Sequence, residues 1–176
     1  KLEVETARTK FALGKDVQSW KVNWAQEDVR QNLDRDLIVP TQYRPFDSRW
    51  TFYTGKSGGF ICRPCRKIMR HVIGQENIAI CVSKQQKTNN GFHHVLIHSD
   101  LIDHSYVSNK TGEIGYSFTL YLYPDEQDLD QTRRVNFDPK LWKKLQKLAT
   151  HKTHGTPDEV ETFDYIYGVL HCPTYR

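Results

Sequence analysis

The stretch NIAICVSKQQKTNNGFHHVLIHS, residues 77–99, contains the two clearest strands of the chain. Residues 77–83 and 93–99 are rich in β-branched and apolar side chains, which favour a pleated, half-buried conformation. A wholly polar loop, residues 84–91, connects them. This pattern predicts two neighbouring strands at the centre of the chain, joined by a solvent-facing connection.

Other segments have the composition of strands. Residues 49–54 (RWTFYT) and 117–123 (SFTLYLY) are rich in aromatic and β-branched residues. Alternating apolar residues predict a short strand over residues 20–24, and the brief apolar segment 36–40 is expected to end at its proline. The middle of the chain is therefore predicted to be mostly β-structure.

Helices are expected on both sides of these strands. Residues 25–33 and 66–73 read as short helices. Start signals at residues 138–139 (Asp-Pro) and 156–159 predict two more, and the last runs to about residue 170. A length of 176 residues suits one domain. We predict an α+β domain with a central mixed or antiparallel sheet flanked by helices, two of them at the C-terminal end.

The positive charge is concentrated in one segment. The chain has 25 Lys and Arg against 21 Asp and Glu, a formal charge of +4. Residues 44–70 contain seven basic residues and a single acid, Asp47, so the remainder is slightly acidic. Such a block indicates a surface that faces a polyanion, with a solvated loop as the alternative.

The cysteines suggest a metal site but do not complete one. Cys62 and Cys65 have the CxxC spacing of a zinc knuckle or redox pair, but no second close pair completes a tetrahedral site. His93 and His94 are adjacent, so on a strand they point to opposite faces. Reduced cysteines, no metal and a cytoplasmic location are predicted. No apolar run approaches the ~20 residues of a membrane helix, so no membrane partner is expected.

Motifs for catalysis are missing. The sequence has no glycine-rich cofactor loop, no Asn-Pro-Pro-aromatic loop and no P-loop around Lys56. Pro-Asp-Glu at residues 124–126 and 157–159 hints at a metal-dependent nuclease, but no Glu-x-Lys follows, and helix capping explains the second. This chain alone is therefore predicted not to be an enzyme.

Without motifs for catalysis, the polar and basic side chains are best interpreted as groups that recognise another molecule. Arg or Lys reads guanine, and Asn or Gln reads adenine, in the major groove of DNA. The loop at residues 84–90 (KQQKTNN) supplies these side chains. Basic residues at 63–70 are suited to phosphates, three of them on a short helix whose N-terminus also attracts anions. This interpretation assumes that the loop and the basic segment lie side by side.

The segment YRPFDSRWTFY, residues 43–53, resembles a signature of large adenine-specific restriction–modification enzymes, the single-polypeptide Type ISP and related Type IIG proteins. Residues 63–72, 77–80 and 118–123 match later motifs of that family in order. The end of the chain, FDYIYGVLHCPTYR at residues 163–176, is also similar to the family's. Cys65 departs from the family, which often has Arg there.

The resemblance implies that residues 25–176 are a target recognition domain. Residues 1–24 would be a linker or extension from an upstream methyltransferase domain in the same polypeptide, which would use S-adenosylmethionine, flip an adenine and methylate it. This piece would need no cofactor and would bind double-stranded DNA. It is expected to be cut from a longer protein.

The resemblance also guides the choice of contact residues. Family members read different sites, so the shared signature blocks should be scaffold, with Arg49 paired to Asp47 or a nearby acid, and base contacts should lie in loops. A second candidate loop is residues 108–110. The residues predicted to contact the DNA backbone are Arg63, Arg66, Lys67, Arg70, Lys84 and Lys87, and those predicted to contact bases are Gln85, Gln86, Asn89, Asn90 and Asn109. The alternative is a protein-interaction module that docks the methyltransferase or nuclease-translocase domains.

Overall fold

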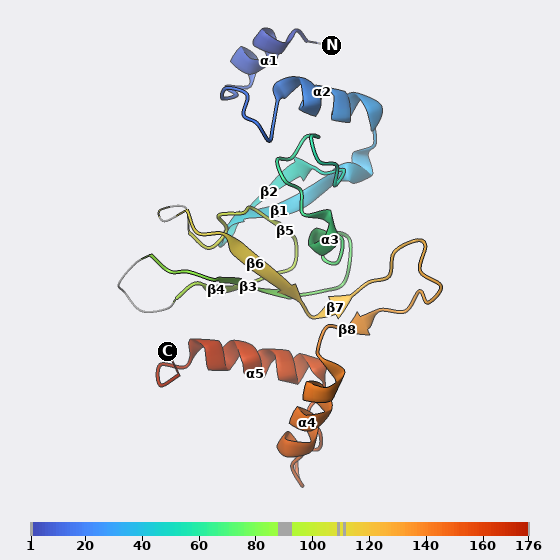
Figure 1. The fold of residues 1–176 in the computed structure, drawn as a ribbon, viewed down its shortest axis with the longest axis vertical. Helices are drawn as coiled ribbons and strands as arrows, with labels where there is room; N and C mark the ends of the chain where they lie inside the picture. Colours follow the sequence, from blue (N-terminus) through green and yellow to red (C-terminus); the bar gives the residue numbers. More distant parts are fainter. Residues whose placement is uncertain (1, 88–92, 109, 111, 176) are drawn as a thin grey trace.

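The computed structural model describes residues 2–87, 93–108, 110 and 112–175 (Figure 1). Helices and strands are mixed along the chain, which confirms the predicted α+β class. The β-structure forms three small sheets, in the orders β2-β1-β5, β4-β3-β6 and β7-β8, in place of the one central sheet that we predicted. Two helices close the C-terminal end, as predicted.

The first sheet contains the signature-like segment. Strand β1 (Ile38–Arg44) pairs antiparallel with β2 (Asp47–Phe52) and parallel with β5 (Leu101–Ile102). We expected the apolar segment 36–40 to end at Pro40, but it enters β1, which continues through the proline to Arg44. β5 pairs only with Thr41 and Gln42, so at Pro40 strand β1 has a neighbour on one side alone, where a missing N–H is tolerated.

The second sheet contains the two central strands that the sequence predicted. Strand β3 (Ala79–Ser83) lies between β4 (Val95–His98) and β6 (Gly115–Thr119), and both pairings are antiparallel. At Gly115 a Cβ atom would lie 2.6 Å from Cys81 Sγ, so only glycine permits this approach of β6 to β3. The third sheet is the short pair β7 (Tyr121–Leu122) and β8 (Arg134–Val135).

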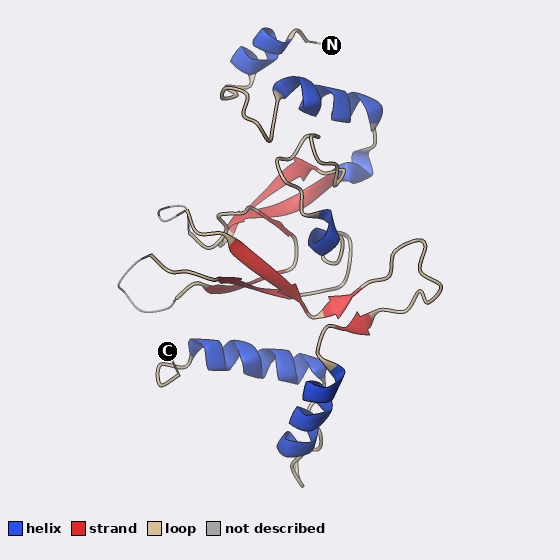
Figure 2. Cartoon of the chain, in the orientation of Figure 1, coloured by secondary structure: helices blue, strands red, loops and turns tan. Residues whose placement is uncertain are grey.

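Helices lie at both ends of the chain (Figure 2). α1 (Val4–Lys10) was not predicted. α2 (Val22–Gln31) confirms the helix predicted over residues 25–33, but it begins earlier and replaces the strand that we predicted over residues 20–24. The alternation of large apolar residues there is not that of a strand, because Val22, Ala25 and Asp28 are buried at helical spacing on one face. A single 3₁₀ turn, Arg35–Leu37, leads into β1.

The other predicted helices are present. α3 (Arg66–Met69) is a single turn, and α4 (Pro139–Ala149) and α5 (Glu159–His171) begin at the expected signals. Asp138 accepts hydrogen bonds from two backbone N–H groups at the start of α4, and Asp158 forms a capping box at the start of α5. Local capping chemistry therefore fixed these two boundaries.

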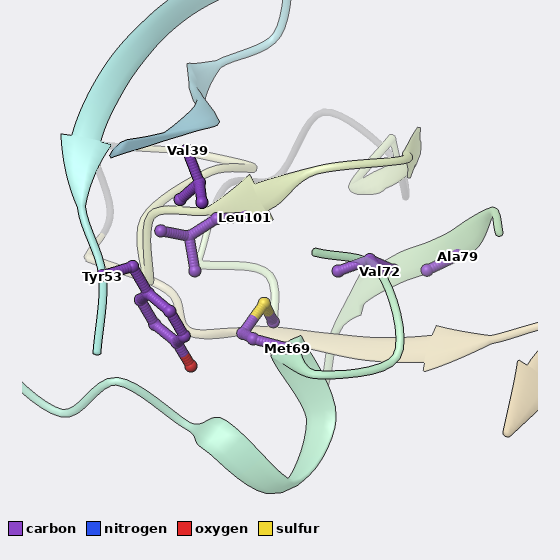
Figure 3. Close-up of a cluster of buried hydrophobic side chains, with 6 residues drawn as sticks. All are labelled: Val39, Tyr53, Met69, Val72, Ala79 and Leu101. Carbon is purple, nitrogen blue, oxygen red and sulfur yellow. The ribbon is translucent and has the colours of Figure 1, made fainter. Parts of the chain in front are cut away.

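Two hydrophobic cores share strand β3. The first comprises Val39, Tyr53, Met69, Val72, Ala79 and Leu101 and packs α3 against the first sheet (Figure 3). The second comprises Ile80, Val95, Leu120, Tyr121 and Phe163 and packs α5 against the second sheet. Ala79 and Ile80 are neighbours on β3, and their side chains alternate between the two cores. A strand buried on both faces thus couples the two halves of the domain.

Candidate nucleic-acid interface

Three connections far apart in sequence meet on one side of the molecule, at the left-hand end of the second sheet in Figure 1. They are the β1–β2 turn at Pro45–Phe46, residues 84–87 with 93–94 between β3 and β4, and residues 103–108 with 112–114 between β5 and β6. We call this group the loop end. Arg44 Nη1 donates to Asp103 Oδ1 at 2.7 Å and joins the first connection to the third. Glu113 accepts a hydrogen bond from the backbone N–H of Lys87 and joins the third to the second.

A buried carboxylate lies at the centre of the loop end. Glu113 is only 4% exposed, and one oxygen of it contacts the His94 ring while the other accepts the Lys87 N–H. Gln86 Oε1 accepts the backbone N–H of His93 at 3.0 Å, which ties the two sides of the β3–β4 connection together. Glu113 was not among the predicted site residues, because an isolated acid in a polar segment gives no local signal of burial.

The predicted DNA-contacting residues of this loop lie in different environments. Lys84, Gln85 and Lys87 are exposed, and the Lys84 ammonium lies 4.3 Å from the centre of the Tyr116 ring. Gln86 is half-buried and its side chain already bonds the backbone. The other predicted base contacts, Asn89, Asn90 and Asn109, lie outside the described residues.

The β1–β2 hairpin adds a stack of cations on an aromatic ring. The guanidinium groups of Arg44 and Arg49 lie 4.0 and 4.1 Å from the centre of the Tyr43 ring. Arg49 Nη2 donates to Asp47 Oδ2 at 2.7 Å, which confirms the predicted pair, and this hydrogen bond is the main cause that lowers the pKa of Asp47. Phe46, in the turn itself, has φ of 65° and a fully exposed side chain.

The expectation that the signature block is scaffold is correct only in part. Tyr53 is buried in the first core and its hydroxyl donates to the Pro64 carbonyl at 2.8 Å. Burial raises the pKa of Tyr53 to about 12, so the phenol stays protonated as a donor at neutral pH. Phe46 and Trp50, however, are exposed, and Trp50 is 72% exposed. Burial depends on the face of the hairpin, which the residue types alone do not reveal.

The basic segment, residues 63–70, lies elsewhere. Figure 1 shows α3 to the right of the view and the loop end to the left, so the juxtaposition that we predicted is not found. Arg63, Arg66 and Lys67 are exposed, and Arg70 Nη1 lies 3.6 Å from Asp125 Oδ2. α3 has only four residues, so the helix-dipole contribution that we expected is minor. Two contacts anchor the segment to the domain: the hydrogen bond from the Tyr53 hydroxyl to the Pro64 carbonyl, and the packing of Met69 in the first core.

A polar cavity of about 350 Å³ lies beside this segment. Arg70, His71, Tyr123 and Arg134 are among its lining residues. His71 Nδ1 accepts the backbone N–H of Tyr123 at 3.0 Å. Burial, followed by the nearby Arg70 and Arg134 charges, lowers the pKa of His71, so the neutral ring is favoured in the fold.

The comparisons with known proteins bear directly on this arrangement. The family model for the Type ISP C-terminal specificity domain matches residues 1–176. The chain belongs to this family. The resemblance noted in the sequence is thereby confirmed, and the domain is a specificity module.

A solved structure has a fold similar to that of this specificity domain. It is described as the cryoEM structure of a DrdV–DNA complex, and the match has a TM-score of 0.60 and 24% sequence identity. The match covers 82% of this chain and 13% of that chain, so the specificity domain spans a small part of the polypeptide that it resembles. No curated protein sequence matches the chain.

Other site types find little support in the described part of the specificity domain. Within residues 2–87, 93–108, 110 and 112–175, no group of three or more His, Cys, Asp or Glu side chains could hold a metal ion. Cys62 and Cys65 are free and exposed, and Cys62 Sγ lies 3.3 Å from the Ser19 hydroxyl. No helix of these same residues is long and apolar enough to cross a membrane.

Proposed function

We propose that this specificity domain recognises a base sequence in double-stranded DNA with its loop end. The observation that carries the proposal is the joining of three separate connections on one side of the molecule, by the Arg44–Asp103 pair and by the Lys87–Glu113 bond. Gln85 is exposed there, and amide and basic side chains are the groups that read base edges. The DNA in the solved complex of similar fold supports the proposal.

In this proposal the basic segment binds phosphates. Arg63, Arg66 and Lys67 are exposed, and phosphate contacts fix register and orientation without reading sequence. The basic segment and the loop end lie at opposite ends of the second sheet (Figure 1). Strands β3 and β6 of this sheet have five residues each and span about 17 Å. Because a duplex presents phosphates along its whole length, contacts one strand length from the base-reading loops are compatible with a single bound duplex.

The parent polypeptide is proposed to be an adenine-specific DNA methyltransferase of the restriction–modification type. Its methyltransferase part would bind S-adenosylmethionine and flip the target adenine, and residues 25–176 would select the site, with residues 1–24 as the connection. The free, exposed thiols of Cys62 and Cys65 support a reducing, cytoplasmic location.

Fluorescence anisotropy with a labelled duplex tests the proposal. The 176-residue chain should bind at low salt, and the affinity should fall steeply with salt, with a log–log slope of about −0.9 per phosphate contact. Selection from a randomised duplex pool should then enrich one sequence. Absence of duplex binding at low salt, or enrichment of no sequence, would contradict the proposal.

A second role is favoured by the face that α4 and α5 share. A groove of about 520 Å³ is lined by Leu141, Leu145, Leu148 and Tyr165, among others. Leu141 is 68% exposed and Leu148 is 77% exposed, so these two leucines of α4 leave an apolar face open to solvent. We propose that the methyltransferase part of the polypeptide packs here.

Binding of the separately produced methyltransferase part to the specificity domain tests this second role. Leu148→Asp should abolish binding, whereas Lys147→Asp, one position away, should change it little. Equal effects of the two substitutions would indicate a charge effect and exclude an apolar contact.

A further inference from the structure

We propose that Glu113 is a positioning residue for sequence recognition, which holds both sides of the β3–β4 connection in one geometry. The inference rests on the proposed DNA recognition and deepens it. Glu113 itself is buried, so it acts through the residues that it holds. The exposed Lys84, Gln85 and Lys87 are the groups so positioned.

Glu113 lies between segments that are far apart in the sequence. It stands two residues before β6, on the connection from β5, and it contacts both the outgoing and the returning side of the β3–β4 connection. On the outgoing side it accepts the Lys87 N–H, and on the returning side it contacts the His94 ring. One carboxylate therefore links three chain segments.

Loss of the Glu113 carboxylate would leave the Lys87 N–H and the His94 ring without their contact to it. A buried carboxylate is stable only when donors surround it, and a buried backbone N–H must find an acceptor. Glu113 supplies the acceptor for Lys87, and the side chain of His94 is only 16% exposed beside it. Removal of the carboxylate would let the Lys87 N–H turn towards water, and the side chains next to it in sequence would move with it.

Gln86 completes this clamp from within the connection. Its Oε1 accepts the His93 N–H at 3.0 Å, so the backbones on the two sides are joined next to the Glu113 contacts. We had predicted Gln86 to contact a base. The geometry instead gives its carbonyl oxygen a positioning role, and this role needs only an acceptor, whereas adenine recognition also needs the amide N–H₂ donor.

Base recognition is sensitive to such positioning. Two hydrogen bonds to one base edge require side-chain atoms in a fixed plane, and each good pair contributes a strong preference for the correct base. Phosphate contacts tolerate movement, because a Lys or Arg charge acts over a broad range of geometries. Loss of the clamp should therefore reduce discrimination between sequences and leave non-specific binding nearly unchanged.

The experiment compares Glu113→Ala with Asp28→Ala as a matched control. Asp28 is also a buried carboxylate, and it accepts hydrogen bonds from the Thr54 hydroxyl and the Phe60 N–H, both at 2.8 Å, away from the loop end. Each substitution removes a buried carboxylate together with both of its acceptor oxygens. Thermal melting of the 176-residue chain establishes that each variant folds.

The readout is the ratio of affinities for the duplex enriched by the wild-type chain and for an unrelated duplex, with the salt slope measured for each. We expect Glu113→Ala to lower the ratio roughly ten-fold or more, the size of a lost base contact, at an unchanged slope. Asp28→Ala should lower the melting temperature and keep the ratio. A folded Glu113→Ala chain with the wild-type ratio, or an equal loss in Asp28→Ala, would overturn the proposal.

A second pair of variants tests the positioning role if Glu113→Ala does not fold. Gln86→Ala removes the acceptor for His93, and Gln86→Glu keeps it while removing the amide donor. The clamp predicts that Gln86→Ala loses discrimination and Gln86→Glu retains it, with a uniform loss of affinity from the added charge. Equal loss in both variants would overturn the positioning role. If the wild-type chain enriches no sequence, the proposed function fails before the clamp is tested.

Discussion

The loop end and the basic segment carry similar side chains but hold them differently. At the loop end, Arg44 is paired with Asp103, Arg49 is paired with Asp47, and Glu113 is buried against His94. In the basic segment Arg63, Arg66 and Lys67 are exposed, on a backbone in which Arg63 and Cys65 have positive φ. The two arginines of the first region are thus paired with acids of the same region and held in position, whereas the basic side chains of the second are exposed to solvent.

This difference indicates two kinds of contact with DNA. A charge that is already paired adds little to non-specific attraction, but its position is well defined, as base reading requires. An exposed, unfixed charge releases counterions when it meets a phosphate and adds affinity for any sequence. The substitutions below separate these two contributions, and the largest effect is expected in the basic segment.

Removal of the basic segment's charges should weaken binding to every duplex alike. A variant with Arg63, Arg66, Lys67 and Arg70 all changed to Ala loses up to four phosphate contacts, and its log–log salt slope should decrease in magnitude by about 0.9 for each. At low salt the loss of affinity should be about 100-fold or more. Anisotropy titrations over a range of salt concentrations measure both quantities.

The specificity ratio is the internal control for this variant. It should stay at the wild-type value, because phosphate contacts do not read sequence. The same number of Lys→Ala changes on α4, at Lys140, Lys143, Lys144 and Lys147, supplies a charge-matched comparison. If the α4 variant weakens binding as much, the basic segment has no special role.

Substitution of Phe46 in the β1–β2 turn should have a smaller effect, and it should change stability and DNA affinity in opposite directions. Phe46 is fully exposed at φ of 65°, a conformation that costs an L-residue about 1–2 kcal/mol and glycine almost nothing. Phe46→Gly should therefore leave the free energy of unfolding unchanged or raise it by about 1 kcal/mol. If the aromatic ring stacks on the bound duplex, affinity should fall about ten-fold.

Urea denaturation and anisotropy of the same preparation check both halves of that prediction. Trp50→Thr is the matched control, since Trp50 is also an exposed aromatic residue of the hairpin but lies on β2, outside the turn. A loss of affinity in Trp50→Thr equal to that in Phe46→Gly would place the duplex against the sheet face and not against the loop end.

Local signals predicted the elements of this fold, and long-range contacts account for what they missed. The caps at Asp138 and Asp158 and the strands at residues 79–83 and 95–98 depend on neighbouring residues, so they could be read from the sequence. The division into small sheets could not, because β5 joins β1 across about sixty residues with only two paired positions.

The same distinction applies to the candidate site. The Arg49–Asp47 pair spans two residues and was predicted, whereas Arg44–Asp103 and Lys87–Glu113 join distant segments and were not. Glu113 is an ordinary acid by composition, and only the meeting of three segments buries it. The exposure of Phe46 likewise depends on a turn with positive φ that a Pro-Phe dipeptide does not specify.

The smallest effect expected is a dependence of the free energy of unfolding on pH that comes from two histidines, His71 beside the basic segment and His98 on β4. Burial lowers the pKa of His71 beside the basic segment and of His98 on β4, and for His71 the Arg70 and Arg134 charges lower it further. An imidazole with a lowered folded pKa contributes stability that is fully present above the unfolded pKa of about 6.5 and is lost as the pH falls through the folded value. Carboxylates contribute mainly below about pH 4, so the free energy of unfolding between pH 5 and 7 should report these two rings.

Arg70→Ala should raise the pKa of His71 and weaken the decline of the free energy of unfolding between pH 7 and 5. The His98 contribution should persist, because burial alone lowers the pKa of that ring. Urea denaturation across this range, with ring-proton NMR titration of each histidine, measures the outcome, and an unchanged decline in Arg70→Ala would contradict a contribution of the Arg70 charge to the pKa of His71.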